Sequence, residues 1–127
     1  MEFLYKARRA DDNEWVIGYG LIFLEKENLA NIVHKHFNNL MQMTGIIPET
    51  ICQYVSDYED CEGQKCFDGD IVTFANMGDL FEGQIRYCDR RLQWIVDVNY
   101  KSDKYQHELF IPLIELSVYN TGKNIHD

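Results

Sequence analysis

Apolar and polar residues alternate most clearly in two neighbouring stretches of the second half of the chain. Between residues 81 and 87 the apolar side chains take odd positions, and between residues 92 and 98 they mostly take even positions. A period of two is typical of strands that bury one face. The segment 89–91 predicts a tight turn, so the two strands form a hairpin. We expect Tyr87 and Trp94 to pack in its core.

Other β-prone segments lie on both sides of this hairpin. Short antiparallel strands joined by tight turns make a meander, and closure into a barrel removes the exposed sheet edges. We therefore expect a mainly β fold with a small barrel over residues 51–120 and a C-terminal tail over 121–127. The additional strands are expected at 51–55, at 71–74, in the segment that ends at Ile111, and at 114–118.

The first 50 residues predict a separate N-terminal β region. Residues 1–7 and 14–23 are extended segments, and the polar link between them is typical of a hairpin turn. Gly18 and Gly20 interrupt the second segment, which predicts a bulge or a close approach of another backbone.

The segment 29–41 is compatible with two structures. Its apolar residues follow the i, i+3, i+4 spacing of one helical face. The β-branched pair Ile32-Val33 and the turn-like doublet Asn38-Asn39 favour two strands joined by a turn. We prefer the strand–turn–strand interpretation, and the helix remains the alternative.

Composition and charge limit the classes of partner. The chain has 127 residues, 46% of them hydrophobic, and a formal net charge of −9. No apolar run approaches the ~20 residues that span a bilayer, and the start lacks a secretory signal, so we expect a cytoplasmic protein without membrane contact. DNA binding requires Lys and Arg to neutralise phosphates. Because the net charge of this chain is strongly negative, we do not expect a nucleic-acid partner.

The spacing of the cysteines and histidines predicts no metal site, and we expect no other cofactor. Cys52, Cys61, Cys66 and Cys88 form no C-x-x-C pair, and the spacing of zinc fingers is absent. We expect reduced thiols. His34 and His36 have a spacing that some metal sites use, but no third ligand lies near them in the sequence.

The densest acidic group lies between residues 59 and 70. Paired carboxylates can perform acid–base chemistry or bind a hard cation, but the ligand register of a calcium loop is absent. We expect these acids to be solvated and assign no catalytic residue. In "DGD" we expect a structural turn, with Gly69 at positive φ and Asp70 accepting backbone N–H bonds. Gly63 is a second turn glycine. The acids are Glu59, Asp60, Glu62, Asp68 and Asp70.

Two tyrosines are candidate recognition residues. Tyr100 and Tyr105 flank a polar loop, and small barrels often bind peptides through surface aromatic residues. The standard phosphate-binding, hydrolase and zinc-protease motifs are absent.

Three ordered blocks, "RADDNEWVIGYG", "IIPETICQYV" and "EDCEGQKCFDGDIVTF", resemble the phage-associated YopX family. The resemblance covers nearly the whole chain. It departs from the family pattern after Tyr54, where Val55-Ser56 and a longer acidic insert replace a T-G-L sequence. The matching positions are Trp15, Gly18, Pro48, Glu49, Thr50, Gln53, Tyr54, Asp60, Gly63, Gly69, Asp70, Ile71 and Val72.

The resemblance implies a C-terminal barrel of the Src-homology-3 (SH3) type. Family members are uncharacterised phage and prophage proteins to which no enzymatic activity is attached. We therefore expect a non-enzymatic accessory protein that binds a phage or host protein. We also expect self-association through the N-terminal strands, because a small barrel with an appended hairpin leaves sheet edges that need covering. Two alternatives remain: a small carboxylate- or metal-dependent enzyme, and a nucleic-acid-associated barrel.

Overall fold

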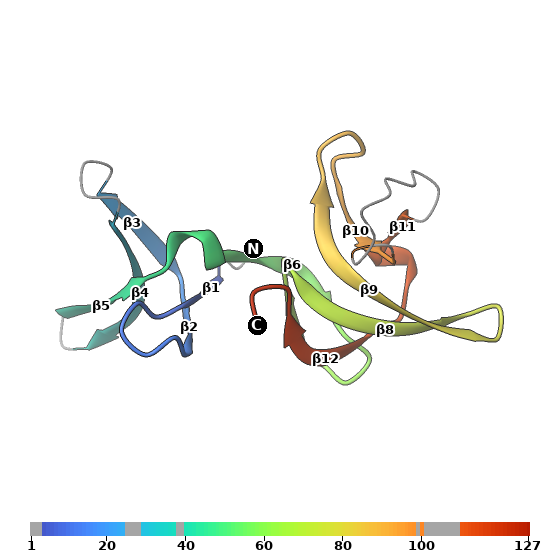
Figure 1. Cartoon of the computed structure of the whole chain (residues 1–127), viewed down its shortest axis with the longest axis horizontal. Coiled ribbons are helices and arrows are strands. Elements are labelled where there is room, and N and C mark those ends of the chain that lie inside the picture. Colours follow the sequence, from blue (N-terminus) through green and yellow to red (C-terminus); the bar gives the residue numbers. More distant parts are fainter. Residues whose placement is uncertain (1–3, 25–28, 38–39, 99, 101–109) are drawn as a thin grey trace. The chain divides into compact units, whose positions relative to one another are not determined.

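The computed structural model describes residues 4–24, 29–37, 40–98, 100 and 110–127. Over these residues the chain is mainly β, as expected, with curled sheets that include a half-barrel (Figure 1). It divides into two compact units, Met1–Ser56 and Asp57–Asp127. No helix among the described residues has the length and apolar character needed to cross a membrane.

The division between the units differs from the expected boundary after residue 50. Strand β6 (Cys52–Glu59) continues beyond residue 55, where the expected strand ends. Its first residues pair with β1, with Tyr5 opposite Gln53 and Lys6 opposite Cys52. These backbone pairs attach residues 52 and 53 to the first unit.

The first unit contains a hairpin and a three-stranded sheet. β1 and β2 form the expected antiparallel hairpin, and β3, β4 and β5 form the sheet in chain order. The segment 29–41 is thus part of two strands, and the helical alternative is wrong; residues 38–39, where the turn was expected, lie outside the described residues. The elements are β1 (Tyr5–Arg8), β2 (Trp15–Gly18), β3 (Gly20–Leu24), β4 (Leu29–Phe37), β5 (Leu40–Ile46) and the 3₁₀ turn η2 (Pro48–Thr50).

Gly18 is the point at which the expected strand 14–23 divides. β2 pairs with β1, whereas β3 pairs with β4, and between them the Tyr19 N–H donates to the Val33 carbonyl at 2.9 Å. A Cβ at Gly18 would lie 2.6 Å from Ile32 Cγ1 and closer still to the Val33 carbonyl oxygen. The expected close backbone approach is present at this glycine.

The second unit contains a five-stranded antiparallel sheet of order β11-β10-β9-β8-β12. β9 curves strongly along its length (Figure 1). Val72 and Phe74 on β8 are buried. The elements that follow β6 are β7 (Lys65–Phe67), β8 (Asp70–Asn76), β9 (Asp79–Cys88), β10 (Gln93–Asp97), β11 (Phe110–Pro112), the 3₁₀ turn η3 (Leu113–Glu115) and β12 (Tyr119–Asn124).

The β9–β10 hairpin forms as expected, but the side chains that it buries are not those that the alternation predicts. Tyr87 is 46% exposed, so the expectation that it packs in the core is wrong. It contacts half-buried Trp94 edge-to-face, with ring centroids 5.5 Å apart. Ile95 takes an odd position, which the alternation assigns to the polar face, but it is fully buried because η3 packs against β10 and contributes buried Leu113. Both faces of β10 are therefore covered at this point.

The expected C-terminal tail is part of the sheet. The strand expected at 114–118 is replaced by η3 and an irregular segment, and β12 begins at Tyr119. β12 pairs with β8 as far as Asn124, which is buried. Its sequence, YNTGKN, has no apolar alternation. Polar side-chain contacts hold this strand in place.

Candidate functional site

The turn between β7 and β8 is built on Gly69 and Asp70. Gly69 has a φ of +86°, which a glycine adopts without the steric cost of a Cβ. Its N–H donates to the Ile85 carbonyl at 2.7 Å. Asp70 is only 1% exposed, and its Oδ2 accepts the Phe67 N–H at 2.9 Å. The carboxylate therefore holds the backbone of the turn, the role that the sequence indicates for it.

Asp70 also binds the C-terminal strand, which the sequence did not reveal. Its Oδ2 accepts a bond from Asn120 Nδ2 at 3.0 Å, and its Oδ1 accepts one from Asn124 Nδ2 at 2.9 Å. The Asn124 amide donates in addition to the Asp68 carbonyl at 3.2 Å. A single carboxylate thus joins the β7–β8 turn to two positions of β12.

Asp60 holds the same strand from a second turn. Its Oδ1 accepts the N–H groups of Glu62 and Gln64, at 2.9 and 2.7 Å, and its Oδ2 accepts the Asn120 N–H at 2.9 Å. Burial raises the pKa of Asp60, but the three backbone donors outweigh burial, and the pKa lies below the ordinary 3.8. The turn also contains Gly63, at a φ of +79°.

The expectation that the acids of this region are solvated is wrong for two of them. Asp60 is 6% exposed and Asp70 is less exposed still, because each accepts several hydrogen bonds that replace its hydration. Glu59 and Glu62 are exposed, as expected. Asp68 is half-buried, and burial raises the pKa of its carboxyl above 3.8; His126 opposes this shift and Asp70 adds to it.

A bulge in β12 determines which residues of this strand lie opposite Ile71 and Asp70, next to the hydrogen-bond network. The register against β8 shifts between Asn120 and Lys123. Within the bulge the Asn120 Oδ1 accepts the Gly122 N–H at 3.0 Å, and the Thr121 hydroxyl donates to the Ile71 carbonyl at 2.7 Å. After the bulge Lys123 lies opposite Ile71, and Asn124 lies opposite Asp70.

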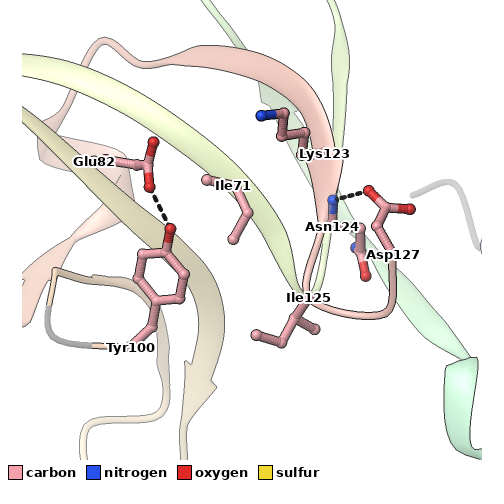
Figure 2. Close-up of a pocket in the computed structure, with 7 residues that line it drawn as sticks. All are labelled: Ile71, Glu82, Tyr100, Lys123, Asn124, Ile125 and Asp127. Atoms are coloured by element: carbon pink, nitrogen blue, oxygen red, sulfur yellow. Dashed lines mark hydrogen bonds between the residues drawn. The ribbon is translucent and has the colours of Figure 1, made fainter. Parts of the chain in front are cut away.

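The last residues of the chain and the outer part of the sheet enclose a pocket of about 370 Å³ (Figure 2). Tyr100 and Glu82 stand on one side, joined by a hydrogen bond from the phenol to Glu82 Oε1. On the other side the Asn124 N–H donates to Asp127 Oδ2 at 2.6 Å. The lining residues are Ile71, Glu82, Tyr100, Lys123, Asn124, Ile125 and Asp127.

The pocket combines charged groups with an apolar surface. Ile71 is buried beneath it, and Ile125 is 45% exposed. Two carboxylates, one ammonium group and one phenol surround these side chains. Open pockets with an apolar base and a few fixed polar groups are typical of binding sites.

Only one of the two tyrosines named from the sequence can be placed. Tyr100 lines the pocket, and Tyr105 lies outside the described residues. The remaining lining residues were not identified from the sequence. Glu82 appeared as one polar position of an alternating strand, and Lys123, Asn124, Ile125 and Asp127 were assigned to the tail.

The described part of the chain contains no group of three or more His, Cys, Asp or Glu residues that could hold a metal ion. The backbone of His34 and His36 belongs to β4, and their side chains lie outside the description. None of the four cysteines forms a disulfide: Cys52 and Cys66 are buried, Cys88 is half-buried and Cys61 is exposed. Comparisons with family models, with curated proteins and with solved structures give no match for this chain.

Proposed function

We propose that the chain is a non-enzymatic protein-interaction module of phage or prophage origin, and that its partner docks at the pocket beside Tyr100. The observation that carries this proposal is the pocket itself, where apolar surface is bordered by charged groups of two sheet strands, Glu82 and Lys123, and by Asp127. The Tyr100–Glu82 hydrogen bond restrains both side chains before a partner arrives. Such preorganisation reduces the entropy lost on binding.

The polar network supports binding in preference to carboxylate catalysis. Both oxygens of Asp60 and both oxygens of Asp70 accept hydrogen bonds from backbone or amide groups. These acids stabilise β12 and thereby position Lys123 and Asn124 in the pocket. The resemblance to YopX proteins and an SH3-like course of the half-barrel belong to the same proposal, because small barrels of that type serve as peptide-binding modules.

The proposal is tested by affinity capture from phage-infected bacterial cells with three forms of the full chain. We expect the unmodified chain to retain a partner that Tyr100→Ala loses, because this change removes the phenol and its bond to Glu82. Tyr119→Ala is the matched control, since Tyr119 is an exposed tyrosine that does not line the pocket. Equal retention by Tyr100→Ala, with its circular dichroism spectrum unchanged, would reject the pocket as the docking site.

A second candidate property is self-association through the N-terminal strands. Leu24 lies opposite Leu29, and Met43 lies opposite Val33, so register places these residues and Ile22 on one face of the β3–β5 sheet. Ile22, Leu24, Leu29 and Met43 are all exposed there. A second copy of this face would remove this apolar surface from water.

Analytical ultracentrifugation tests self-association. We expect a dimeric mass for the unmodified chain and a monomeric mass for Leu24→Glu, which places a charge within the apolar face. Leu92→Glu is the control, because Leu92 is exposed in the second unit. A monomer at high concentration would contradict self-association and leave the pocket proposal intact.

A further inference from the structure

We infer that the segment entering the pocket carries a basic side chain, arginine in preference to lysine. This inference rests on the proposed function and specifies the chemistry of the partner. The first observation is the charge of the lining, which contains the carboxylates of Glu82 and Asp127 and the single ammonium group of Lys123. Figure 2 shows Glu82 on one side and Asp127 on the other, with Ile71 between them.

The second observation is the distribution of charge along the chain. Residues 57–127 contain fourteen acidic and seven basic residues, whereas residues 1–56 contain seven and five. The unit that carries the pocket therefore holds most of the net negative charge. Such a field attracts a cationic partner, raises its association rate and disfavours an anionic one.

The third observation is the apolar surface between the charged groups. Arginine and lysine lay their aliphatic stems on apolar surface while their charged heads stay near water or an acid. Ile71 and Ile125 supply such a surface, and Tyr100 adds an aromatic ring whose face attracts cations. Arginine is preferred because its planar guanidinium matches the geometry of carboxylates and stacks on aromatic rings.

A substitution of Lys123 can show whether the pocket prefers a positive or a negative ligand. Its ammonium group repels a cation in the pocket and attracts an anion. Lys123→Met keeps much of the stem and removes the charge, so it should strengthen binding of a basic segment and weaken binding of an acidic one. Glu82→Gln should have the opposite effect in each case.

The test is an NMR titration of the ¹⁵N-labelled full chain with two decapeptides that differ only in charge. One alternates arginine with glycine and serine, and the other carries glutamate at the same positions. We expect the arginine peptide to shift pocket amides and to bind more tightly than the glutamate peptide. Glu82→Gln should weaken its binding about two- to fivefold, and Lys123→Met should strengthen it by a similar factor, as for a partly solvated charge pair.

Two variants outside the pocket serve as charge-matched controls. Lys65→Met and Glu115→Gln change exposed charges of the same types on other elements and should change the affinity less than the pocket variants do. Higher salt should weaken binding of the arginine peptide, since screening reduces attraction between exposed charges.

Several outcomes would overturn the inference. They are equal or tighter binding of the glutamate peptide, weaker binding by Lys123→Met, shifts confined to amides outside the pocket, and no binding of either peptide. The proposed function fails on a different result, retention of the captured partner by Tyr100→Ala. A partner lost in that variant but held more tightly by Glu82→Gln would keep the docking site and reject its basic ligand.

Discussion

The two units are built from the same kind of short antiparallel strand and both bury apolar side chains, but the last strand of the second unit is attached in a different way. The first unit has an apolar cluster of Ala7, Ala30, Ile32 and Ile46, and its strands approach closely at Gly18. In the second unit the last strand is fastened by buried carboxylates and by the amides that donate to them. The difference shows that a strand without apolar alternation can be as well specified as one that has it.

The two modes of attachment fail in different ways. Apolar packing tolerates substitutions that conserve volume but not added volume, whereas a buried polar network leaves donors without acceptors when one member is removed. Asp70 is a buried carboxylate that accepts three hydrogen bonds of the network, and Gly18 has the closest neighbours among the glycines of the first unit. Substitutions at these two positions separate the two modes.

The largest effect is expected for Asp70→Ala. The change removes the acceptor of the Phe67 N–H and of the Asn120 and Asn124 amides. An unsatisfied buried donor costs about 1–3 kcal/mol, so we expect a loss of about 3–5 kcal/mol in the free energy of unfolding. Denaturant titration measures this loss, with Asp79→Ala, an exposed aspartate of the β8–β9 hairpin, as control.

Hydrogen exchange extends this experiment to the comparison of the units. In Asp70→Ala, amides of β8 and β12 should lose protection before those of β3 and β4. An equal loss of protection in both units, or no loss of stability, would show that the network does not stabilise the second unit selectively.

A somewhat smaller effect is expected for Gly18→Ala, in the other unit. The added Cβ would overlap the Val33 carbonyl and Ile32 Cγ1, and the backbone at Val33 can yield only by separating the strands. Overpacking of this kind costs about 1–3 kcal/mol. Gly45→Ala is the control, because a Cβ there meets nothing closer than 3.8 Å. Equal stability of the two variants would contradict the close approach.

Local sequence patterns predicted the parts of the fold that are held by apolar packing and tight turns. The strands of both hairpins, the segment 29–41 as strands and the turn at Gly69 follow from alternation, β-branched residues and glycine. The burial of Ile95 did not follow, because it depends on η3, which comes from a distant segment.

The candidate site was less accessible to sequence reasoning. Only Tyr100 was identified, because it is an aromatic residue beside a loop. The partners of Asp70 on β12 lie 50 and 54 residues further along the chain, and neither asparagine belongs to a motif. Contacts of this kind follow from the course of the chain in three dimensions, and no local pattern encodes them.

Gly69→Ala should have an intermediate effect on the turn that the network holds. The positive φ of Gly69 strains a Cβ by about 1–2 kcal/mol. The Cβ would also lie 2.9 Å from Ile125 Cγ2, the end of an exposed side chain that is able to move. Gly63→Ala has the same φ strain and only a distant contact, at 3.7 Å from Glu59. Thermal unfolding should therefore show Gly69→Ala to be the less stable variant, and the reverse order would contradict the packing of Ile125 on this turn.

The smallest effect is expected for Asp68→Asn, and its dependence on pH distinguishes the acids of the two turns. Burial raises the folded-state pKa of Asp68, so ionisation lowers stability as the pH rises from about 3.8 through this raised pKa. Asparagine removes that loss, and we expect a gain of a few tenths of a kcal/mol at neutral pH because Asp68 is partly solvated.

Asp60 has the opposite sign, because its folded-state pKa is lowered. Its contribution is present above pH 3.8 and is lost as the pH falls through that lowered pKa. Unfolding curves between pH 3 and pH 7 should therefore show Asp68→Asn gaining stability relative to the unmodified chain as the pH rises, and Asp60→Asn losing it. If the stability of both variants changed in the same direction as the pH rises, the carboxylates of Asp60 and Asp68 would lie in similar environments. The distinction between Asp60, which fastens β12, and Asp68, which is partly solvated, would then be wrong.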